Sequence, residues 1–176
     1  RQSSMPSLPE PRRSAASAAS SPAPGHSRWR RSAMLRASLR VPSAGAQWSG
    51  ITTRIAERLL ETGAVDAVLT MTADPDDRWR PVPVLVTQAK DMAACRGMRM
   101  GYAPLLSLLE PARERGFKRL AVIGIPCQVY ALRALEQELG FERLFVIGTP
   151  CSDNTTTERF HEFLALLTDR PETITY

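Results

Sequence analysis

The sequence lacks the features that define several common classes of protein. No apolar run in its 176 residues approaches the roughly 18 residues of a membrane-spanning helix, so we expect no integral membrane association. Three cysteines are too few for a disulfide scaffold, which favours a reducing compartment and a cytoplasmic location. The chain also has no Ser-His-Asp order, no H-E-x-x-H motif and no Walker loop, so these motifs identify no catalytic residue.

Acidic residues are almost absent from the first quarter of the chain. Residues 1–46 hold eight arginines and one acid, whereas residues 47–176 hold 15 basic and 17 acidic side chains. The formal charge of +5 is therefore the sum of +7 on the amino-terminal segment and −2 on the rest of the chain. Because phosphate binding needs a basic face on the fold itself, the sequence predicts no nucleic-acid partner.

Large apolar residues are also scarce in residues 1–46, which contain 11 Ser, 9 Ala and 6 Pro. Such a segment buries too little surface to offset the entropy of ordering, so we predict a disordered tail followed by a folded domain of residues 47–176. Three origins of the tail stay open. It is a transit peptide to a plastid, an unstructured basic arm, or the product of a shifted reading frame.

The folded part contains an internal repeat. The segment RLAVIGIPC (residues 119–127) returns 24 residues later as RLFVIGTPC (residues 143–151). Each copy is a short apolar run, then G-x-P-C, then a pattern with helical periodicity, and residues 153–155 offer a cap for the second helix. The repeat predicts an α/β fold whose core is a parallel sheet of repeated strand–GxPC–helix units.

Shorter patterns predict the remaining elements. Amphipathic spacing favours a helix over residues 51–62, capped by Ser49 or Thr52. Apolar runs predict strands over residues 65–71 and 81–87, and the prolines of the second run restrict it to a sheet edge. Short helices are expected over residues 91–97 and 105–115, and residues 173–176 look like the start of a strand.

The repeat places Cys127 and Cys151 at one edge of the predicted sheet. Ligands of such sheets bind beyond the carboxyl ends of the strands. If the two repeated strands are neighbours, their axes lie about 4.8 Å apart and both thiols face the same crevice. Each cysteine is also expected to open a helix, whose dipole stabilises the thiolate that binds metal or attacks as a nucleophile. A zinc or iron–sulfur site needs about four ligands, of which the two turns supply two. A structural role as small buried residues is the alternative.

A second candidate site precedes the first expected helix, in QWSGITT (residues 47–53). It contains small or hydroxyl-bearing residues: Ser49, Gly50, Thr52 and Thr53. Free N–H groups at a helix start can bind a phosphate, although such residues also serve simply as caps.

Three other side chains have the chemistry of site residues. Cys95 is predicted to be structural, because unpaired cysteines are commonly buried. His161 lies on the last expected helix and is predicted to be a surface residue or one with a satisfied side chain. Asp153 is the carboxylate nearest to the predicted crevice and is the remaining candidate for a proton donor.

The motifs together resemble the family of the coenzyme F420 hydrogenase/dehydrogenase beta subunit. The resemblance rests on GAQWSGIT (residues 45–52), GIPCQ (124–128) with ALR (131–133), and GTPCSDN (148–154). It covers about residues 45–176. The branch that it resembles contains 7-hydroxymethyl chlorophyll a reductase and the ferredoxin-dependent divinyl chlorophyllide 8-vinyl reductase.

The resemblance implies an iron–sulfur flavoprotein oxidoreductase. Such proteins bind FAD and 4Fe-4S clusters, and pass electrons between a ferredoxin-like donor or F420 and a small-molecule substrate such as a tetrapyrrole or a deazaflavin. Cys127 and Cys151 match cluster-ligating cysteines of the family, and residues 49, 50, 52 and 53 match the segment that lies against the flavin nucleotide. Family proteins carry further cysteines on both sides of these motifs, so the chain is expected to be a fragment, truncated at its C-terminus.

Two other functions stay open. A thiol-redox or zinc-binding α/β protein would use Cys127 and Cys151 alone. A non-catalytic subunit or remnant would need neither cysteine. The sequence does not identify the substrate.

Overall fold

The computed structural model describes residues 50–97, 99–152 and 154–174, all within a unit that comprises residues 37–176. The predicted tail of residues 1–46 lies outside the described residues, as do Ser49 and Asp153. The prediction that a strand begins at residue 173 is wrong, because Pro171–Thr173 form a short 3₁₀ turn, labelled η4. Residues 175–176 of that expected strand lie outside the described residues.

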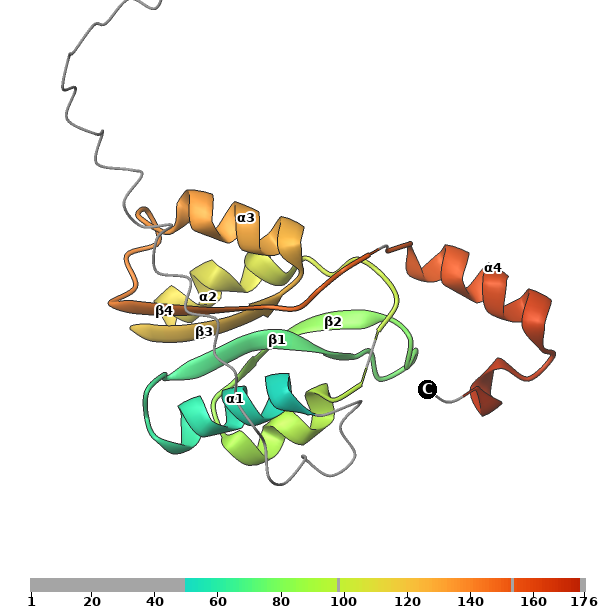
Figure 1. Cartoon of the computed structure of the whole chain (residues 1–176), viewed down its shortest axis with the longest axis horizontal. Coiled ribbons are helices and arrows are strands. Elements are labelled where there is room, and N and C mark those ends of the chain that lie inside the picture. Colours follow the sequence, from blue (N-terminus) through green and yellow to red (C-terminus); the bar gives the residue numbers. More distant parts are fainter. Residues whose placement is uncertain (1–49, 98, 153, 175–176) are drawn as a thin grey trace, which may run out of the picture. The chain divides into compact units, whose positions relative to one another are not determined.

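A mixed, mostly parallel sheet forms the centre of the domain, in the strand order β2-β1-β3-β4 (Figure 1). Strands β1 (Ala67–Ala73), β3 (Arg119–Gly124) and β4 (Arg143–Gly148) run parallel. Strand β2 (Pro81–Val86) pairs with β1 in the antiparallel sense and lies at the sheet edge. The predicted α/β class and the edge position of the proline-bearing strand are therefore confirmed, and the antiparallel hairpin is an addition to the predicted parallel core.

The two copies of the repeat pair with each other residue by residue. Arg119 lies opposite Arg143, and the pairing continues without a shift to Gly124 opposite Gly148. Beyond the last pair, the backbone N–H and the hydroxyl of Thr149 both donate to the carbonyl oxygen of Gly124, at 2.9 and 3.3 Å. The predicted parallel direction of the repeated strands is thus confirmed, and the structure shows that the two strands are neighbours.

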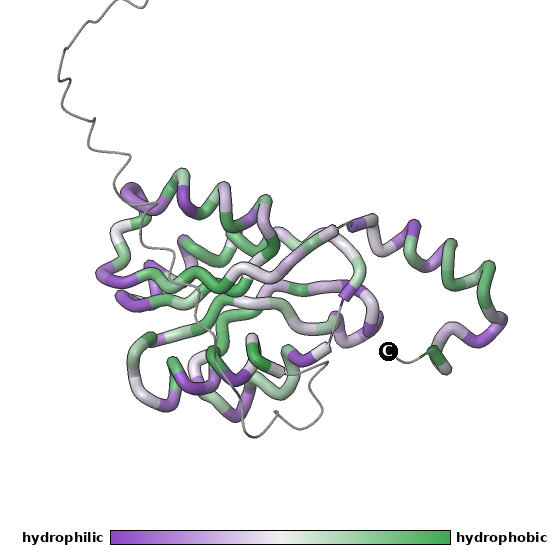
Figure 2. Tube along the Cα trace, in the orientation of Figure 1, coloured by the Kyte–Doolittle hydropathy of each residue, from purple (hydrophilic) through white to green (hydrophobic). Residues whose placement is uncertain are grey.

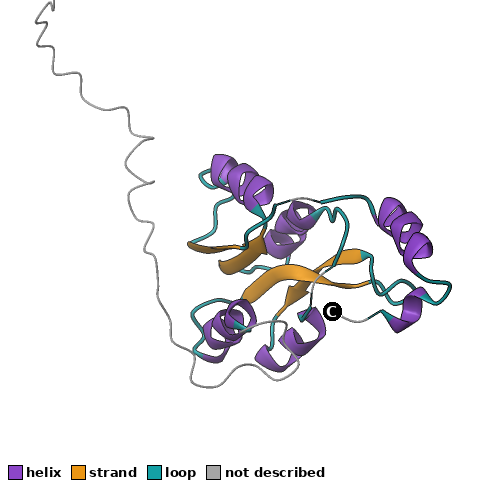
Figure 3. Ribbon diagram, turned by 45° about the vertical axis from the view of Figure 1, so that its right-hand side comes forward, coloured by secondary structure: helices purple, strands orange, loops and turns teal. Residues whose placement is uncertain are grey.

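Helices cover both faces of the sheet (Figures 1 and 3). One face carries α1 (Ile51–Glu61) and the 3₁₀ helix η2 (Ala89–Cys95). The other carries α3 (Pro126–Leu135) and a continuous pair of turns, η3 (Leu105–Leu108) and α2 (Leu109–Glu114). Each predicted helix is therefore present, although the segment of residues 91–97 is a 3₁₀ helix that begins earlier.

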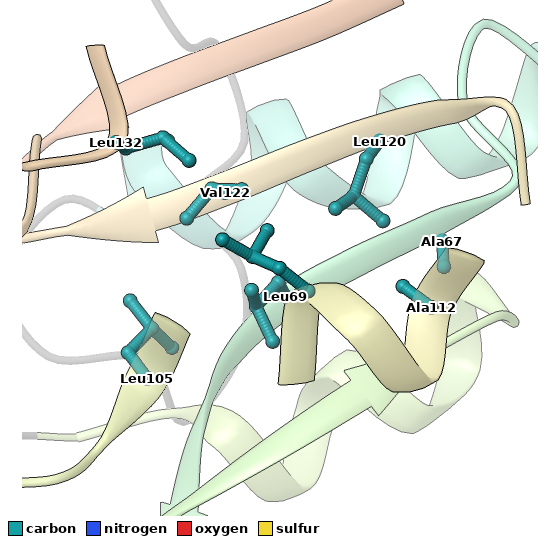
Figure 4. Packing of buried hydrophobic residues seen from close by; sticks show 8 residues of the cluster. Ala67, Leu69, Leu105, Ala112, Leu120, Val122 and Leu132 are labelled. Atoms are coloured by element: carbon teal, nitrogen blue, oxygen red, sulfur yellow. The ribbon is translucent and has the colours of Figure 1, made fainter. Parts of the chain in front are cut away.

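Alternation along the strands divides the core between the two faces. Val68 and Ala121 pack toward α1 and η2, whereas Leu69, Leu120 and Val122 pack toward α2 and α3. Figure 4 shows this second cluster from close by, and Figure 2 shows hydrophobic stretches in the strands and also in the helices. Successive residues of a strand point to opposite faces, so one short apolar run supplies both layers.

Helix α4 (Thr157–Leu167) lies beside the tip of the β1–β2 hairpin and not over β3 and β4 (Figure 1). The rings of Trp79 and Phe160 meet edge to face at 5.2 Å, and Leu164 is buried. His161 Nε2 lies 2.8 Å from Asp77 Oδ2. The second helix of the repeat therefore departs from the first, which folds back onto the sheet.

Candidate functional site

Cys127 follows the carboxyl end of β3, where α3 begins. Pro126 is the first helical residue, a position that needs no N–H donor, and Cys127 is the second and is exposed. Gln128 closes the turn, because its Oε1 accepts a hydrogen bond from the N–H of Ile125 at 3.1 Å. The prediction that this cysteine opens a helix is confirmed.

Cys151 occupies a different local structure. It is exposed and lies in an irregular segment after β4, and α4 begins only at Thr157. The cap of α4 is Thr156, whose hydroxyl oxygen accepts a hydrogen bond from the N–H of Arg159 at 3.2 Å. The predictions that Cys151 opens a helix and that residues 153–155 cap it are therefore wrong. The reason is that Asn154, one of the expected caps, binds backbone elsewhere in the fold.

The two cysteines nevertheless lie at equivalent positions on neighbouring strands. Each is the third residue after a glycine, and Gly124 and Gly148 are paired in the sheet. Both thiols are exposed at this carboxyl edge. The edge therefore presents two sulfur donors from adjacent loops, in the region where α/β sheets bind ligands.

A third segment, residues 101–103, contacts both cysteine loops. The side-chain amide of Asn154 accepts from the N–H of Gly101 and donates to the Gly101 carbonyl, each at 3.2 Å. Gln128 Nε2 donates to the carbonyl oxygen of Ala103 at 3.3 Å. The sequence reasoning missed both amides. The available signal was their place in the motifs GIPCQ and GTPCSDN.

The donor set at the carboxyl edge is incomplete for a metal site. Within the described residues, no group of three or more His, Cys, Asp and Glu side chains gathers in one place. Two exposed thiols, one of them at a helix start, suit a soft metal such as iron or zinc. They provide two of the roughly four ligands that zinc or a 4Fe-4S cluster needs, so other donors must complete either site.

The predicted flavin-binding segment lies at the start of α1. Gly50 is the residue before the helix and adopts a left-handed conformation with φ of 66°, which glycine accommodates without strain. Thr52 does not cap the helix, contrary to one of the expectations above, because Gly50 holds the cap position and none of the described side chains caps this helix start. Thr52 and Thr53 are half-buried.

The two candidate sites share an edge of the sheet but lie on different faces. Helix α1 runs back along β1, so its start lies toward the carboxyl edge, on the face opposite to α3 (Figure 1). The N–H groups of this first turn are therefore oriented for an anion at that edge. Ser49, the fourth residue of the predicted segment, lies outside the described residues.

Cys95 and His161 have structural surroundings, as predicted. Cys95 packs against the α1 face of the core, and burial raises the pKa of its thiol, which disfavours the thiolate that binds metal. It also lines a pocket of about 250 Å³ beside β2, which is the outer strand at the end of the sheet away from β4. His161 contacts Asp77, and this pair joins α4 to the hairpin.

At the amino ends of the strands, opposite to the cysteines, Asp66 forms a cluster of hydrogen bonds and an ion pair. Asp66 Oδ2 accepts hydrogen bonds from the N–H groups of Lys118 and Arg119, at 2.9 and 2.8 Å. Hydrogen bonding by the Arg119 guanidinium lowers the pKa of Asp66 to about 2. This cluster fixes the amino end of β3 and lies away from both cysteines.

Among the described residues, the helices are all too short or too polar to cross a bilayer.

Two family models match the chain in order. Residues 34–110 match the amino-terminal region of the coenzyme F420 hydrogenase/dehydrogenase beta subunit, and residues 117–176 match its carboxyl-terminal region. The first match begins at residue 34, whereas the motifs that carry the resemblance begin at residue 45. The similarity therefore extends into the segment predicted to be a tail.

Named relatives are redox enzymes. The chain is 42% identical over 133 residues to the chloroplastic 7-hydroxymethyl chlorophyll a reductase of Oryza sativa subsp. japonica, covering 76% of this chain and 28% of the relative. It is 34% identical over 95 residues to a subunit of the F(420)H(2) dehydrogenase of Methanosarcina mazei, covering 54% and 27% respectively. The chain thus spans less than a third of the length of these relatives, which fits a domain of a larger protein.

A solved structure has a similar fold. A chain of the F420-reducing NiFe hydrogenase complex from Methanosarcina barkeri matches with a TM-score of 0.63 and 27% identity, over 68% of this chain and 43% of that chain. Sequence and fold comparisons therefore agree. The chain belongs to the redox-enzyme family of the coenzyme F420 hydrogenase/dehydrogenase beta subunit.

Proposed function

We propose that this chain is the cysteine-bearing module of an iron–sulfur flavoprotein oxidoreductase. The observation that carries the proposal is the in-register pairing of the repeat, which sets Cys127 and Cys151 after adjacent strand ends. Two exposed thiols in that arrangement are suited to hold part of one 4Fe-4S cluster. The remaining ligands come from outside the described residues.

The start of α1 is the proposed contact for FAD. Its N–H groups and the hydroxyls of Thr52 and Thr53 would bind the pyrophosphate, and Gly50 would allow close approach of the backbone. Ser49 belongs to the same proposal. No acidic residue lies in the first turn of α1 to repel an anion.

The proposed partners follow from the redox enzymes that the chain resembles. When bound, the cluster and FAD would carry electrons between a ferredoxin-like donor or F420 and an organic substrate. The rice relative is chloroplastic, which favours a plastid for this chain if residues 1–46 act as a transit peptide. A cytoplasmic location is the alternative.

Reconstitution of the full chain tests the metal assignment. The chain is loaded anaerobically with iron and sulfide, in excess small-molecule thiol that supplies the missing ligands, and bound iron and visible absorbance are measured after desalting. We expect a brown product from the wild type and from Cys95→Ser, the matched control, and loss of bound iron in Cys127→Ser and in Cys151→Ser.

Four results would contradict the proposal. A colourless wild-type chain would remove the iron–sulfur assignment, as would a double Cys127→Ser/Cys151→Ser variant that keeps its iron. One zinc per chain with no visible absorbance would instead indicate the zinc-binding alternative. Reversible formation of a Cys127–Cys151 disulfide without metal would indicate the thiol-redox alternative.

A further inference from the structure

We propose that Gln128 and Asn154 are positioning residues that fix the two cysteine loops to one shared backbone segment and so set the separation of the two thiols. This separation matters for metal binding only if the proposed function holds. The shared segment, residues 101–103, belongs to neither copy of the repeat. It lies on the connection between η2 and η3.

Gln128 does more than close its own helix turn. Its Oε1 accepts from the N–H of Ile125, which accounts for local capping. Its Nε2 extends outside the helix to the carbonyl oxygen of Ala103, at 3.3 Å. Both ends of the amide are used, so the residue that follows Cys127 ties the first cysteine loop to the shared segment.

Asn154 makes the equivalent connection for the second loop. Its amide forms a reciprocal pair of hydrogen bonds with the backbone of Gly101, and its Oδ1 also accepts from the N–H of Thr155 at 2.9 Å. The hydroxyl of Tyr102 donates to the Asn154 carbonyl oxygen at 3.4 Å. Helix capping does not require these contacts, because Thr156 caps α4.

The shared segment fits closely against the start of α4, which follows the second loop. A Cβ on Gly101 would lie 2.4 Å from Thr157 Oγ1, and Gly101 has a φ of 147°. The side-chain hydroxyl of Thr157 also lies 3.5 Å from the carbonyl oxygen of Met100. Because the segment is hydrogen-bonded to both loops, displacement of either amide alters the position of one cysteine relative to the other.

The amide is specifically required by this geometry. Aspartate in place of Asn154 keeps the acceptor for the Gly101 N–H but loses the donor to the Gly101 carbonyl, and glutamate in place of Gln128 likewise loses the donor to Ala103. The conservative variants therefore keep the size of the side chain and its acceptor, but they replace one defined hydrogen bond by a repulsive contact between a carboxylate oxygen and a carbonyl oxygen. They separate positioning from general loss of packing.

The test measures the separation of the two thiols in the full chain without metal. In a Cys95→Ser background, nitroxide labels are attached to Cys127 and Cys151, and the distance between them is obtained from dipolar electron paramagnetic resonance. The variants are Asn154→Ala, Asn154→Asp, Gln128→Ala and Gln128→Glu. The control is Gln137→Ala, which removes an exposed amide near the end of α3.

We expect one narrow distance population in the wild type and in Gln137→Ala. The alanine variants should lose this narrow component and shift to longer mean distances. Asn154→Asp and Gln128→Glu should shift by less, with melting temperatures close to wild type. If these variants are loaded with iron, the spectrum of the bound metal should change in the same order.

Unchanged distances in the alanine variants, or equal broadening in Gln137→Ala, would overturn the proposal. Should an alanine variant fail to fold, Asn154→Asp and Gln128→Glu decide the question, and unchanged distances in both overturn it. The distances are independent of metal uptake. A wild-type chain that binds no iron therefore contradicts the proposed function alone, and unchanged distances contradict this inference alone.

Discussion

The two copies of the repeat have nearly the same sequence but different structural roles. Strand β3 is central and mostly buried, whereas β4 is at the sheet edge and half-exposed along its length. After the strands, the first copy continues directly into α3, and the second crosses an irregular segment before α4. Equivalent residues thus contribute differently to stability, because position in the sheet determines how much surface each one buries.

The largest expected difference concerns a matched pair of leucines. Leu120 is fully buried between the strands and α2, whereas Leu144, its partner across the β3–β4 pair, is only partly buried. Leu120→Ala should lower the free energy of unfolding by about 2–5 kcal/mol, through lost burial and the cavity left behind. Leu144→Ala should cost clearly less. Urea denaturation of both variants measures the difference, and equal losses would mean that β4 is as buried as β3.

A second difference concerns the arginine that begins each copy. Arg119 binds Asp66, whereas the guanidinium of Arg143 lies over the Phe145 ring at 5.9 Å. Asp66→Asn should lower the stability at neutral pH by about 1–2 kcal/mol, because two backbone N–H groups and a guanidinium lose a charged acceptor.

The same carboxylate predicts a pH dependence. Its pKa is lowered from 3.8 to about 2 in the folded chain, so its contribution is complete above about pH 4 and is lost as the pH falls toward 2. Urea denaturation between pH 5 and pH 2 should show this loss in the wild type and a shallower decline in Asp66→Asn. Parallel curves for the two proteins would show that Asp66 is not the titrating group.

The smallest expected difference concerns the glycine that ends each strand. A Cβ on Gly124 would lie 3.2 Å from Gln128 Oε1, whereas a Cβ on Gly148 would meet only Val129 Cγ2 at 3.9 Å. Gly124→Ala should therefore cost about 1 kcal/mol, and Gly148→Ala should stay within about 0.5 kcal/mol of wild type. Thermal melts of the two variants distinguish them. Equal melting temperatures would show that the first turn yields without cost.

The sequence was sufficient for features that depend on local pattern or on the repeat. The shared motif predicted that β3 and β4 are parallel, and prolines predicted the edge position of β2. Helix α1 ends within a residue of its predicted limit. In each case the determinant lies within a few residues of the element that it specifies.

Features that depend on distant contacts were not predictable in the same way. The start of α4 was misplaced because Asn154 is held by Gly101, more than fifty residues earlier in the sequence. The position of α4 beside the hairpin depends on Trp79 and Asp77, which no motif connects with Phe160 and His161. The assignments of Cys127 and Cys151 to a cluster, and of residues 49, 50, 52 and 53 to a flavin, stay predictions.

Because β3 and β4 pair without a shift, the number of residues between the two copies of the repeat determines where Cys151 lies and which way the β4 side chains point. A slip of one residue would move the second cysteine by about 3.3 Å along its strand and would turn every β4 side chain to the other face. Phe145 and Val146 would exchange the layers against which they pack. An insertion that moves this register would therefore misplace the donor atom and expose the core together, so selection for folding also preserves the geometry of the sulfur pair.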